Sequence, residues 1–392
     1  MSNHPVFLVM LVAVAATLIA EIPIGFRLPV VVLEMVLGIV IGPHGLGMTD
    51  ASGLLGWLGG TAGLAALFFM GGVELDLDRV RGRPLALAVG GWALSLLLGL
   101  SFAGLLYLAS IIRSPVLVGL SLTTTSLGML LPILKDKGEF DTQFGRFALA
   151  AGAVGEFGPV IVMSLLLTTE YSHWQEVVLM LAFVGIAFVA ANVALKARPP
   201  KALELLTRTM NSSAQLPVLL SVLLLTSFLV LSETFGFEGV LGAFAGGMVV
   251  GLATRGKQGE PLREKIDAIG FGFFMPFFFV VSGIKFDLGA LLNSRMAMLI
   301  LPMFLVLLFV VRGAPVYLYR KELAKAEKLP FALYSASALP LIVALTEIGV
   351  RTHRMTSDIA AALVGAGMVS VLLFPTLAGI LRTRSVSPAD HQ

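Results

Sequence analysis

The sequence predicts an all-α polytopic membrane protein that is built from two inverted repeats of six helices. The first observation is composition, because 57% of the residues are hydrophobic and only 13% are charged, whereas soluble domains carry about 25% charged residues. The second is a series of apolar runs of transmembrane length, and the third is an internal repeat. The chain has no cysteine, which excludes disulfides, thiol catalysis and thiolate metal sites.

Apolar runs long enough to span a bilayer occur thirteen times, separated by polar residues, glycine or proline. The first run lacks the basic segment of a signal peptide, so it is predicted to be retained. The 42 glycines favour close packing of these helices, because small residues let backbones approach. The predicted spans are 5–22, 28–43, 54–75, 84–110, 115–134, 143–168, 176–196, 215–232, 238–254, 266–284, 296–319, 329–349 and 357–381.

The distribution of basic residues supports this count. If alternate loops lie on opposite faces, one face holds 21 of the 27 Lys and Arg residues and the other holds 5, while Arg312 lies inside span eleven. By the positive-inside rule the richer face is cytoplasmic. This places the N-terminus outside the cell inner (plasma) membrane and the C-terminus in the cytoplasm. The loops are short, so nucleic acid is not an expected partner, and any cytoplasmic regulatory domain is expected to be a separate subunit.

The two halves of the chain resemble each other in sequence. Residues 72–77 match 283–288, and 126–138 match 337–349, both at an offset of 211; Glu34 matches Glu238 at an offset of 204. These matches predict a first repeat over 1–168, a connecting span over 169–200 and a second repeat over 201–392. A single connecting helix brings the second repeat in from the opposite face. The repeats are therefore inverted, as in many secondary transporters.

Spans five and twelve are predicted to be broken within the membrane. In span five, three threonines and a serine at 123–126 are followed by Pro132, and in span twelve Ser335 and Ser337 precede Pro340. Hydroxyls can satisfy the freed backbone groups of an unwound segment or coordinate a cation. The alternative is that they only form hydrogen bonds between helices. The candidate cation-coordinating residues are Thr125, Ser126 and Ser337.

Glu156 is a carboxylate in the middle of span six, and no other charged residue lies between Arg146 and Glu170. An ionisable group at mid-depth is costly and therefore indicates a functional site. The small residues around it leave room for a neighbouring helix, water or an ion. The alternative is a carboxyl group that burial keeps neutral and that serves only as a hydrogen-bond donor. Glu156 is the candidate proton- and cation-binding residue, and a monovalent cation is the only metal ion expected there.

Arg312 is the only basic residue deep in a predicted span. It lies about 12 Å from the predicted cytoplasmic face, and Glu156 lies about 15 Å from it. A guanidinium stays protonated, so Arg312 needs a partner, either Glu156 or the dipolar end of a broken helix. A structural or charge-balancing role is therefore predicted. Glu34, Glu74 and Glu347 lie nearer the ends of their spans. Interface solvation, helix capping or packing is therefore the role predicted for these three residues.

A single carboxylate can hold either a proton or a small monovalent cation, because both compete for the same oxygens. Carrying one in each direction gives one-for-one exchange, which is electroneutral because Arg312 does not release a proton. The sequence therefore predicts a secondary active transporter that exchanges Na⁺ or K⁺ for H⁺. It predicts no enzyme, since no buried His cluster, paired aspartates or nucleophile with a base is found, and it calls for no cofactor.

The chain resembles the bacterial monovalent cation:proton antiporters of the sodium/proton exchanger superfamily, of the cation:proton antiporter-2 type. The resemblance covers essentially the whole length and lies in the runs 28–43, 68–75, 125–128, 239–247 and 275–284, which occur in order. It implies the antiporter fold with crossed broken helices and a homodimer that works by elevator-like alternating access. It also implies an ion-transport core over 84–168 and 296–382 and a dimerisation domain over 1–83 and 210–290.

The resemblance gives Glu156 the position of the family's ion-binding Asp, and it gives Arg312 a position where Arg is similar to electroneutral members. Gly155 replaces the Asp, Asn or Gln that commonly precedes the ion-binding residue, and residues 336–338 lack the Arg-Gly-Glu triplet of many relatives. A Glu in place of the Asp leaves the choice of cation open. The alternatives are a gated potassium-efflux transporter with a separate regulatory subunit, an organic-anion symporter on the related fold, and a sensor that changes conformation with pH.

Overall fold

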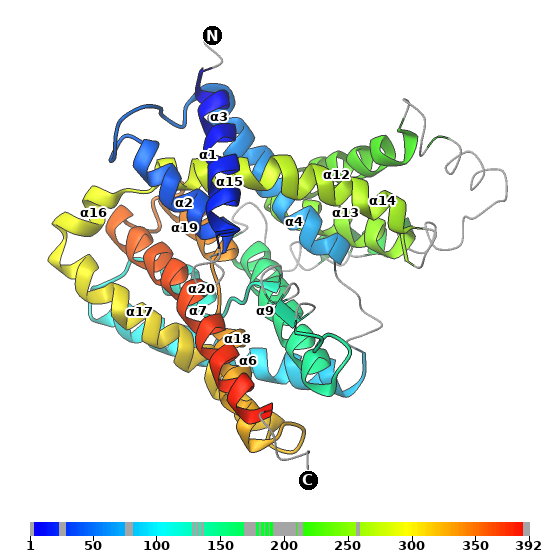
Figure 1. The fold of residues 1–392 in the computed structure, drawn as a ribbon, viewed down its shortest axis with the longest axis vertical. Coiled ribbons are helices and arrows are strands. Elements are labelled where there is room, and N and C mark those ends of the chain that lie inside the picture. Colours follow the sequence, from blue (N-terminus) through cyan, green and yellow to red (C-terminus); the bar gives the residue numbers. More distant parts are fainter. Residues whose placement is uncertain are drawn as a thin grey trace. The chain divides into compact units, whose positions relative to one another are not determined.

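The structure, a computed structural model, describes residues 4–22, 29–74, 81–127, 137–167, 215–255 and 259–386, together with scattered positions between 130 and 209. All regular secondary structure within these residues is helical (Figure 1). The chain divides into two compact units. Unit 1 comprises Met1–Ala13, Ala51–Asp76 and Val160–Ser282, and unit 2 comprises Val14–Asp50, Leu77–Pro159 and Gly283–Gln392.

Eight helices in the described part of the chain are long and apolar enough to cross a membrane. Three shorter apolar helices accompany them, namely α1 (His4–Ala20), α2 (Val30–Ile41) and α13 (Gly239–Ala253). The chain is therefore an all-α, multi-pass membrane protein. Predicted span seven, 176–196, falls largely outside the described residues, so the count of thirteen and the inverted arrangement of the repeats stay predictions.

Unit 1 contains two spans that are interrupted by π-helical turns. One passes through α3 (Gly53–Gly56), η1 (Trp57–Ala62) and α4 (Gly63–Glu74), and the other through α14 (Glu260–Ile269), η2 (Gly270–Phe274) and most of α15 (Met275–Lys285). The two cross closely, because a Cβ at Gly59 would lie 2.3 Å from the Cβ of Val281. The second span begins at Glu260 rather than at the predicted 266, since its charged first turns continue the helix beyond the apolar run.

Helices α4 and α13 pack backbone against backbone within unit 1. A Cβ at Gly72 would lie 2.3 Å from the carbonyl oxygen of Phe244, and one at Gly247 would lie 2.0 Å from that of Phe69. Any larger residue at either position would push the helices apart. This is the close approach that small residues permit between membrane helices. Helix α12 (Leu216–Thr234) also packs against α13.

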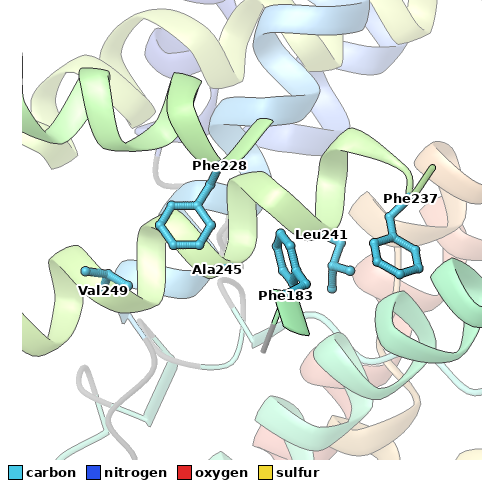
Figure 2. Close-up of a cluster of buried hydrophobic side chains, with 6 residues drawn as sticks. All are labelled: Phe183, Phe228, Phe237, Leu241, Ala245 and Val249. Carbon is cyan, nitrogen blue, oxygen red and sulfur yellow. The ribbon is translucent and has the colours of Figure 1, made fainter. Parts of the chain in front are cut away.

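A buried apolar cluster joins α12 and α13 to part of the predicted connecting span (Figure 2). The ring of Phe183 meets the rings of Phe228 and Phe237 nearly edge-on, with centroids 5.9 and 6.1 Å apart, an arrangement that aromatic pairs favour. Residues 182 and 183 are helical. The cluster consists of Phe183, Phe228, Phe237, Leu241, Ala245 and Val249.

In unit 2, α17 (Arg295–Gly313) and α20 (Ser357–Val386) lie side by side (Figure 1). The first part of α9 (Gln143–Leu167), up to Pro159, belongs to the same unit. The remaining long helices pack against this pair or against one another. They are α6 (Arg83–Leu108), α7 (Pro115–Leu122), α18 (Lys328–Ala336) and α19 (Pro340–Arg351). The short α16 (Leu288–Asn293) precedes α17, and η3 (Ala314–Tyr319) and η4 (Lys325–Glu327) lie between α17 and α18.

Serine side chains set the starts of two of these helices. Ser114 accepts the backbone N–H of Leu117 at 3.3 Å, directly before Pro115 at the start of α7. Ser294 accepts the N–H of Ala297 at 3.1 Å at the start of α17. Serine at the N-cap satisfies a donor that the first helical turn leaves open, and proline suits the first helical position. Both starts are therefore specified locally by the sequence.

Both predicted helix breaks are present in unit 2. Helix α7 ends at Leu122 and residues 123–126 are not helical; α18 ends at Ala336, and residues 337–339 are not helical before α19 begins at Pro340. The predicted spans 84–110, 143–168, 215–232, 296–319 and 357–381 also agree closely with α6, α9, α12, α17 with η3, and α20.

Candidate ion site at two helix breaks

The two helix breaks contact each other through their backbones. The N–H of Ser126 in the first break donates to the carbonyl oxygen of Ser337 in the second, at 2.8 Å. From α20, Ser370 supports the second break, because its Oγ accepts the N–H of Ala338 at 3.2 Å and donates to the carbonyl of Gly367 at 2.7 Å. Backbone groups that leave the helical ladder must find such partners in a membrane.

The threonines after α7 explain how the first break is tolerated. The hydroxyls of Thr123 and Thr124 donate to the carbonyls of Leu120 and Ser121, each at 2.8 Å. The last carbonyls of a helix have no intrahelical donor, and short polar side chains can supply one. These two hydroxyls therefore satisfy backbone groups at the end of α7, and their bonds lie within that helix rather than between helices.

Glu156 of α9 reaches the first break. Its Oε2 accepts the backbone N–H of Leu127 at 2.7 Å, and Leu127 is the first helical residue after the break. The N–H groups at the start of a helix lack intrahelical acceptors and favour a negative charge. The carboxylate side chain is partly buried. The structure therefore brings the candidate carboxylate of span six to the candidate break of span five.

Pro159 opens a second contact between α9 and the same break. Proline has no N–H, so the carbonyl of Gly155, four residues earlier, has no helical donor. The N–H of Thr125 donates to this carbonyl at 3.1 Å. The proline in α9 and the unwound segment thus satisfy each other's backbone groups, and they bring Thr125 directly beside the residue that precedes Glu156.

Arg312 of α17 is 4% exposed and links several elements of unit 2. Its Nε donates to Oγ1 of Thr125 at 2.8 Å and to the carbonyl of Ser335 at 3.3 Å. Its Nη1 donates to Oγ of Ser95 at 3.3 Å, and its Nη2 donates to the carbonyl of Ala151 at 3.1 Å. Ser335 lies in the last turn of α18, so its carbonyl belongs to the negative end of a broken helix. The predicted contact with such a helix end is present.

The three candidate hydroxyls differ in what they bind. Oγ1 of Thr125 donates to the carbonyl of Ser335 at 2.5 Å and accepts from Arg312. Oγ of Ser337 donates to the carbonyl of Leu333 at 3.1 Å. Oγ of Ser126 is buried and has no hydrogen-bond partner in the described part of the chain. Geometry therefore favours Ser126 over the other two as a hydroxyl that is available to a cation.

Three residues at this site were not singled out by the sequence. They are Ser95, Ser370 and Trp92, whose ring lies against α9, since a Cβ at Gly158 would be 2.6 Å from Cε2 of the indole. No local sequence pattern marks these three residues, so only the fold reveals these contacts. The indole Nε1 of Trp92 is buried without a hydrogen-bond partner among the described residues.

The other carboxylates of the spans have different surroundings. Glu347 pairs with Lys285 at 2.6 Å, and both side chains are partly exposed. Glu34 is buried in α2, with 4% of its surface exposed. In the residues that the structure describes, no group of three or more His, Cys, Asp or Glu side chains is placed to hold a metal ion.

Comparisons with known proteins show the family to which the chain is similar. The family described as sodium/hydrogen exchanger, transmembrane, matches residues 9–381. The Bacillus subtilis protein YjbQ is 26% identical over 387 residues, which cover 93% of this chain and 61% of YjbQ. The Bacillus cereus Na⁺/H⁺–K⁺ antiporter GerN is 26% identical over 292 residues, which cover 74% of this chain and 73% of GerN.

A solved structure has the same fold over nearly the whole chain. It is the sodium proton antiporter MjNhaP1 from Methanocaldococcus jannaschii, with a TM-score of 0.72 and 17% sequence identity, covering 98% of this chain and 99% of that one. At this identity the likeness concerns the fold alone. With respect to YjbQ, the chain spans about three fifths of the relative's length.

Proposed function

This chain belongs to the sodium/hydrogen exchanger family, and we propose that it exchanges a monovalent cation, Na⁺ or K⁺, for H⁺ across the membrane, with Glu156 binding the two in turn. One observation carries the proposal: a carboxylate within a membrane-spanning helix accepts the first N–H after a helix break that contacts a second break. An ionisable residue in such a place is costly and is retained for function. The names of relatives, among them a Na⁺/H⁺–K⁺ antiporter, support this class of substrate.

The carboxylate of Glu156 offers chemistry that suits alternate binding of the two ions. A carboxylate has two oxygens with about four lone-pair sites, and one of these sites accepts the N–H of Leu127. A proton or a small cation neutralises the same negative charge, so binding of one opposes binding of the other. Ser126 supplies a neutral oxygen next to Leu127, and this hydroxyl is the additional ligand that we propose for the cation.

The exchange is proposed to be one-for-one and electroneutral. Arg312 is a fixed positive charge that donates to the neutral oxygens of Thr125, Ser335, Ser95 and Ala151. An arginine keeps its proton throughout the working pH range, so Arg312 balances charge without moving protons. Glu156 is then the only group of the site that exchanges ions, and each turnover moves one positive charge in each direction.

The setting in the cell is proposed from the distribution of charge and from the family. Loops rich in Lys and Arg favour a cytoplasmic C-terminus and an external N-terminus in the plasma membrane. Elevator-like alternating access, with the core at 84–168 and 296–382 carrying the ion, is expected from the resemblance to the family. A homodimer, in which 1–83 and 210–290 form the contact between protomers, and a separate regulatory subunit are expected from the resemblance.

The test is ion flux in liposomes that contain the purified protein and a pH-sensitive dye. An imposed pH gradient is challenged with NaCl, KCl or choline chloride, with and without valinomycin to clamp the voltage. The variants are Glu156→Gln and, as a matched control, Glu347→Gln, which removes a carboxylate that pairs with Lys285 at a partly exposed position. Both substitutions keep the size of the side chain and remove its negative charge.

We expect Na⁺ or K⁺ to dissipate the gradient in the wild type at a rate that valinomycin leaves unchanged. Glu156→Gln should abolish this flux, and Glu347→Gln should retain it. Flux that depends on voltage would contradict electroneutrality. Flux that survives in Glu156→Gln would contradict the site, and the absence of any cation-dependent flux in the wild type would favour the organic-anion symporter or the sensor.

A further inference from the structure

The surface of α9 next to Glu156 is occupied by side chains from other elements. A Cβ at Gly155 would lie 2.4 Å from Nη2 of Arg312 and 2.7 Å from Oγ1 of Thr125. Distances under 3.0 Å are essentially never seen for real Cβ atoms. The guanidinium and the threonine hydroxyl therefore fill the volume that any side chain at position 155 would need.

Neither neighbour can move aside without loss. Nη2 of Arg312 donates to the carbonyl of Ala151, and Nε donates to Thr125. Thr125 is also held by its N–H, which donates to the carbonyl of Gly155 itself at 3.1 Å. A buried donor that loses its acceptor is strongly unfavourable, and more so when it is charged. The guanidinium of Arg312 and the hydroxyl of Thr125 are therefore held in place and cannot shift freely to make room for a side chain at 155.

We propose that Gly155 is a positioning residue for the ion site: the absence of a side chain at 155 admits Arg312 and Thr125 to the contact between the two helix breaks. The size of the side chain that position 155 tolerates thus depends on the side chain at position 312. With Arg312 placed as it is in this chain, a side chain at 155 would compete with its guanidinium for the same volume. The effect on transport rests on the proposed exchange at Glu156, whereas the coupling in stability does not.

A side chain at 155 would affect the ion site through three consecutive residues, 125–127. A side chain at 155 would displace Thr125, and Ser126 and Leu127 follow it directly in the chain. Ser126 donates to the second break, and Leu127 donates to Glu156. Displacement of Thr125 would therefore move both the proposed hydroxyl ligand and the backbone donor that holds the carboxylate. We expect the cation affinity to fall more than the maximal rate, because ligands are misplaced while the exchanging carboxylate is kept.

Gly152 offers a matched control one turn earlier on the same helix. A Cβ there would lie 3.1 Å from Cδ1 of Leu127 and 3.2 Å from Cδ2 of Leu130. These are methyl groups at the ends of leucine side chains, which can shift by a few tenths of an ångström. Gly152→Ala makes the same change in helix propensity as Gly155→Ala, so a difference between the two variants reports the contact with Arg312 and Thr125.

The experiment is a double-mutant cycle on the full chain, with Gly155→Ala, Arg312→Gln, the double variant and the Gly152→Ala control. The KM and maximal rate for Na⁺ and K⁺ are measured in liposomes, and the melting temperature is measured in detergent. Glutamine lacks the Nη2 atom that a methyl group at position 155 would meet. If Arg312→Gln yields no folded protein, Arg312→Lys serves as the background, because lysine also lacks this atom.

We expect Gly155→Ala to raise the cation KM by about tenfold and to lower the melting temperature, with Gly152→Ala close to the wild type. In the Arg312→Gln background, the same substitution should change KM by less than about threefold and should lower the melting temperature less. If Gly155→Ala had the KM and melting temperature of the wild type, or if it changed them equally in both backgrounds, the proposed coupling would be wrong. If the wild type shows no exchange, the proposed function fails, and the melting temperatures still decide the coupling.

Discussion

The backbone N–H of Ser126 donates to the carbonyl oxygen of Ser337 at 2.8 Å, and so joins two interrupted helices that are far apart in sequence. The two serines are 211 residues apart, which is the offset at which the two halves of the sequence match. Each break therefore satisfies a backbone group of the other. Such pairing is needed in the membrane, where an unwound segment has no bulk water to bind.

Removal of the Ser370 hydroxyl should destabilise the second break. Oγ of Ser370 accepts the N–H of Ala338, and Ser370→Ala leaves this buried donor without its acceptor, at a cost of about 1–3 kcal/mol. The melting temperature in detergent should fall. Ser101→Ala is the control, because Ser101 is exposed and bonds only within α6, to the carbonyl of Leu97. Equal melting temperatures for the two variants would contradict this role of Ser370.

The hydroxyl of Ser126 should contribute to cation binding and little to stability. It has no hydrogen-bond partner in the described part of the chain, so Ser126→Ala breaks no such bond. Loss of one neutral ligand should raise the cation KM by about five- to tenfold, which corresponds to about 1 kcal/mol. Ser337→Ala should leave KM near the wild-type value, since that hydroxyl bonds to Leu333. A larger rise in KM for Ser337→Ala than for Ser126→Ala would reverse this ranking.

The sequence predicted the helices and their breaks well because both depend on local patterns. Long apolar runs mark α6, α9, α17 and α20, while hydroxyls followed by proline mark the end of α18 and the start of α19. The start of α14 at Glu260 was missed for a physical reason. Residues 260–269 are polar overall but form a helix with separate polar and apolar faces, and a search for apolar runs passes over such a segment.

The partners within the site could not be predicted, because they depend on contacts between distant parts of the chain. Arg312 meets Ser95, which is 217 residues away in sequence, and no local pattern links the two. The sequence marked Gly155 as one of the small residues around Glu156 and as a departure from related sequences. Its physical reason, the volume taken by the guanidinium of Arg312, appears once α9 and α17 are placed together.

The length of the side chain at 156 should set cation affinity. Glu156→Asp keeps the carboxylate but shortens it by one methylene, so it can no longer reach the N–H of Leu127 as Oε2 does now at 2.7 Å. A hydrogen bond to a charged group is worth about 1.5–3 kcal/mol, so KM should rise about tenfold or more, while exchange persists. Competition between Na⁺, K⁺ and Li⁺ in liposomes measures the preference. Complete loss of exchange in Glu156→Asp would show that exchange needs more from residue 156 than a carboxylate charge, even at a shorter reach.

Arg382 should stabilise unit 2 without affecting exchange. Its Nε pairs with Glu139 at 2.5 Å, its Nη1 pairs with Glu327 at 3.3 Å, and its Cζ lies 3.8 Å from the centroid of the Phe144 ring. The side chain is 10% exposed, and removal of one partner of a buried ion pair costs about 3–5 kcal/mol. Arg382→Gln should lower the melting temperature markedly and leave the cation KM unchanged. A changed KM would instead connect this cluster to the ion site.

Trp92 should report the state of Glu156 by fluorescence. Its ring packs against Gly158, two residues after Glu156 on α9, and its buried Nε1 has no acceptor among the described residues. Indole emission responds to nearby charge, so binding of a cation to the carboxylate should shift or quench it. Trp57→Phe and Trp174→Phe leave Trp92 as the only tryptophan, because the chain has three. The cation-dependent change should vanish when Glu156→Gln is added, and its persistence there would place the bound cation elsewhere.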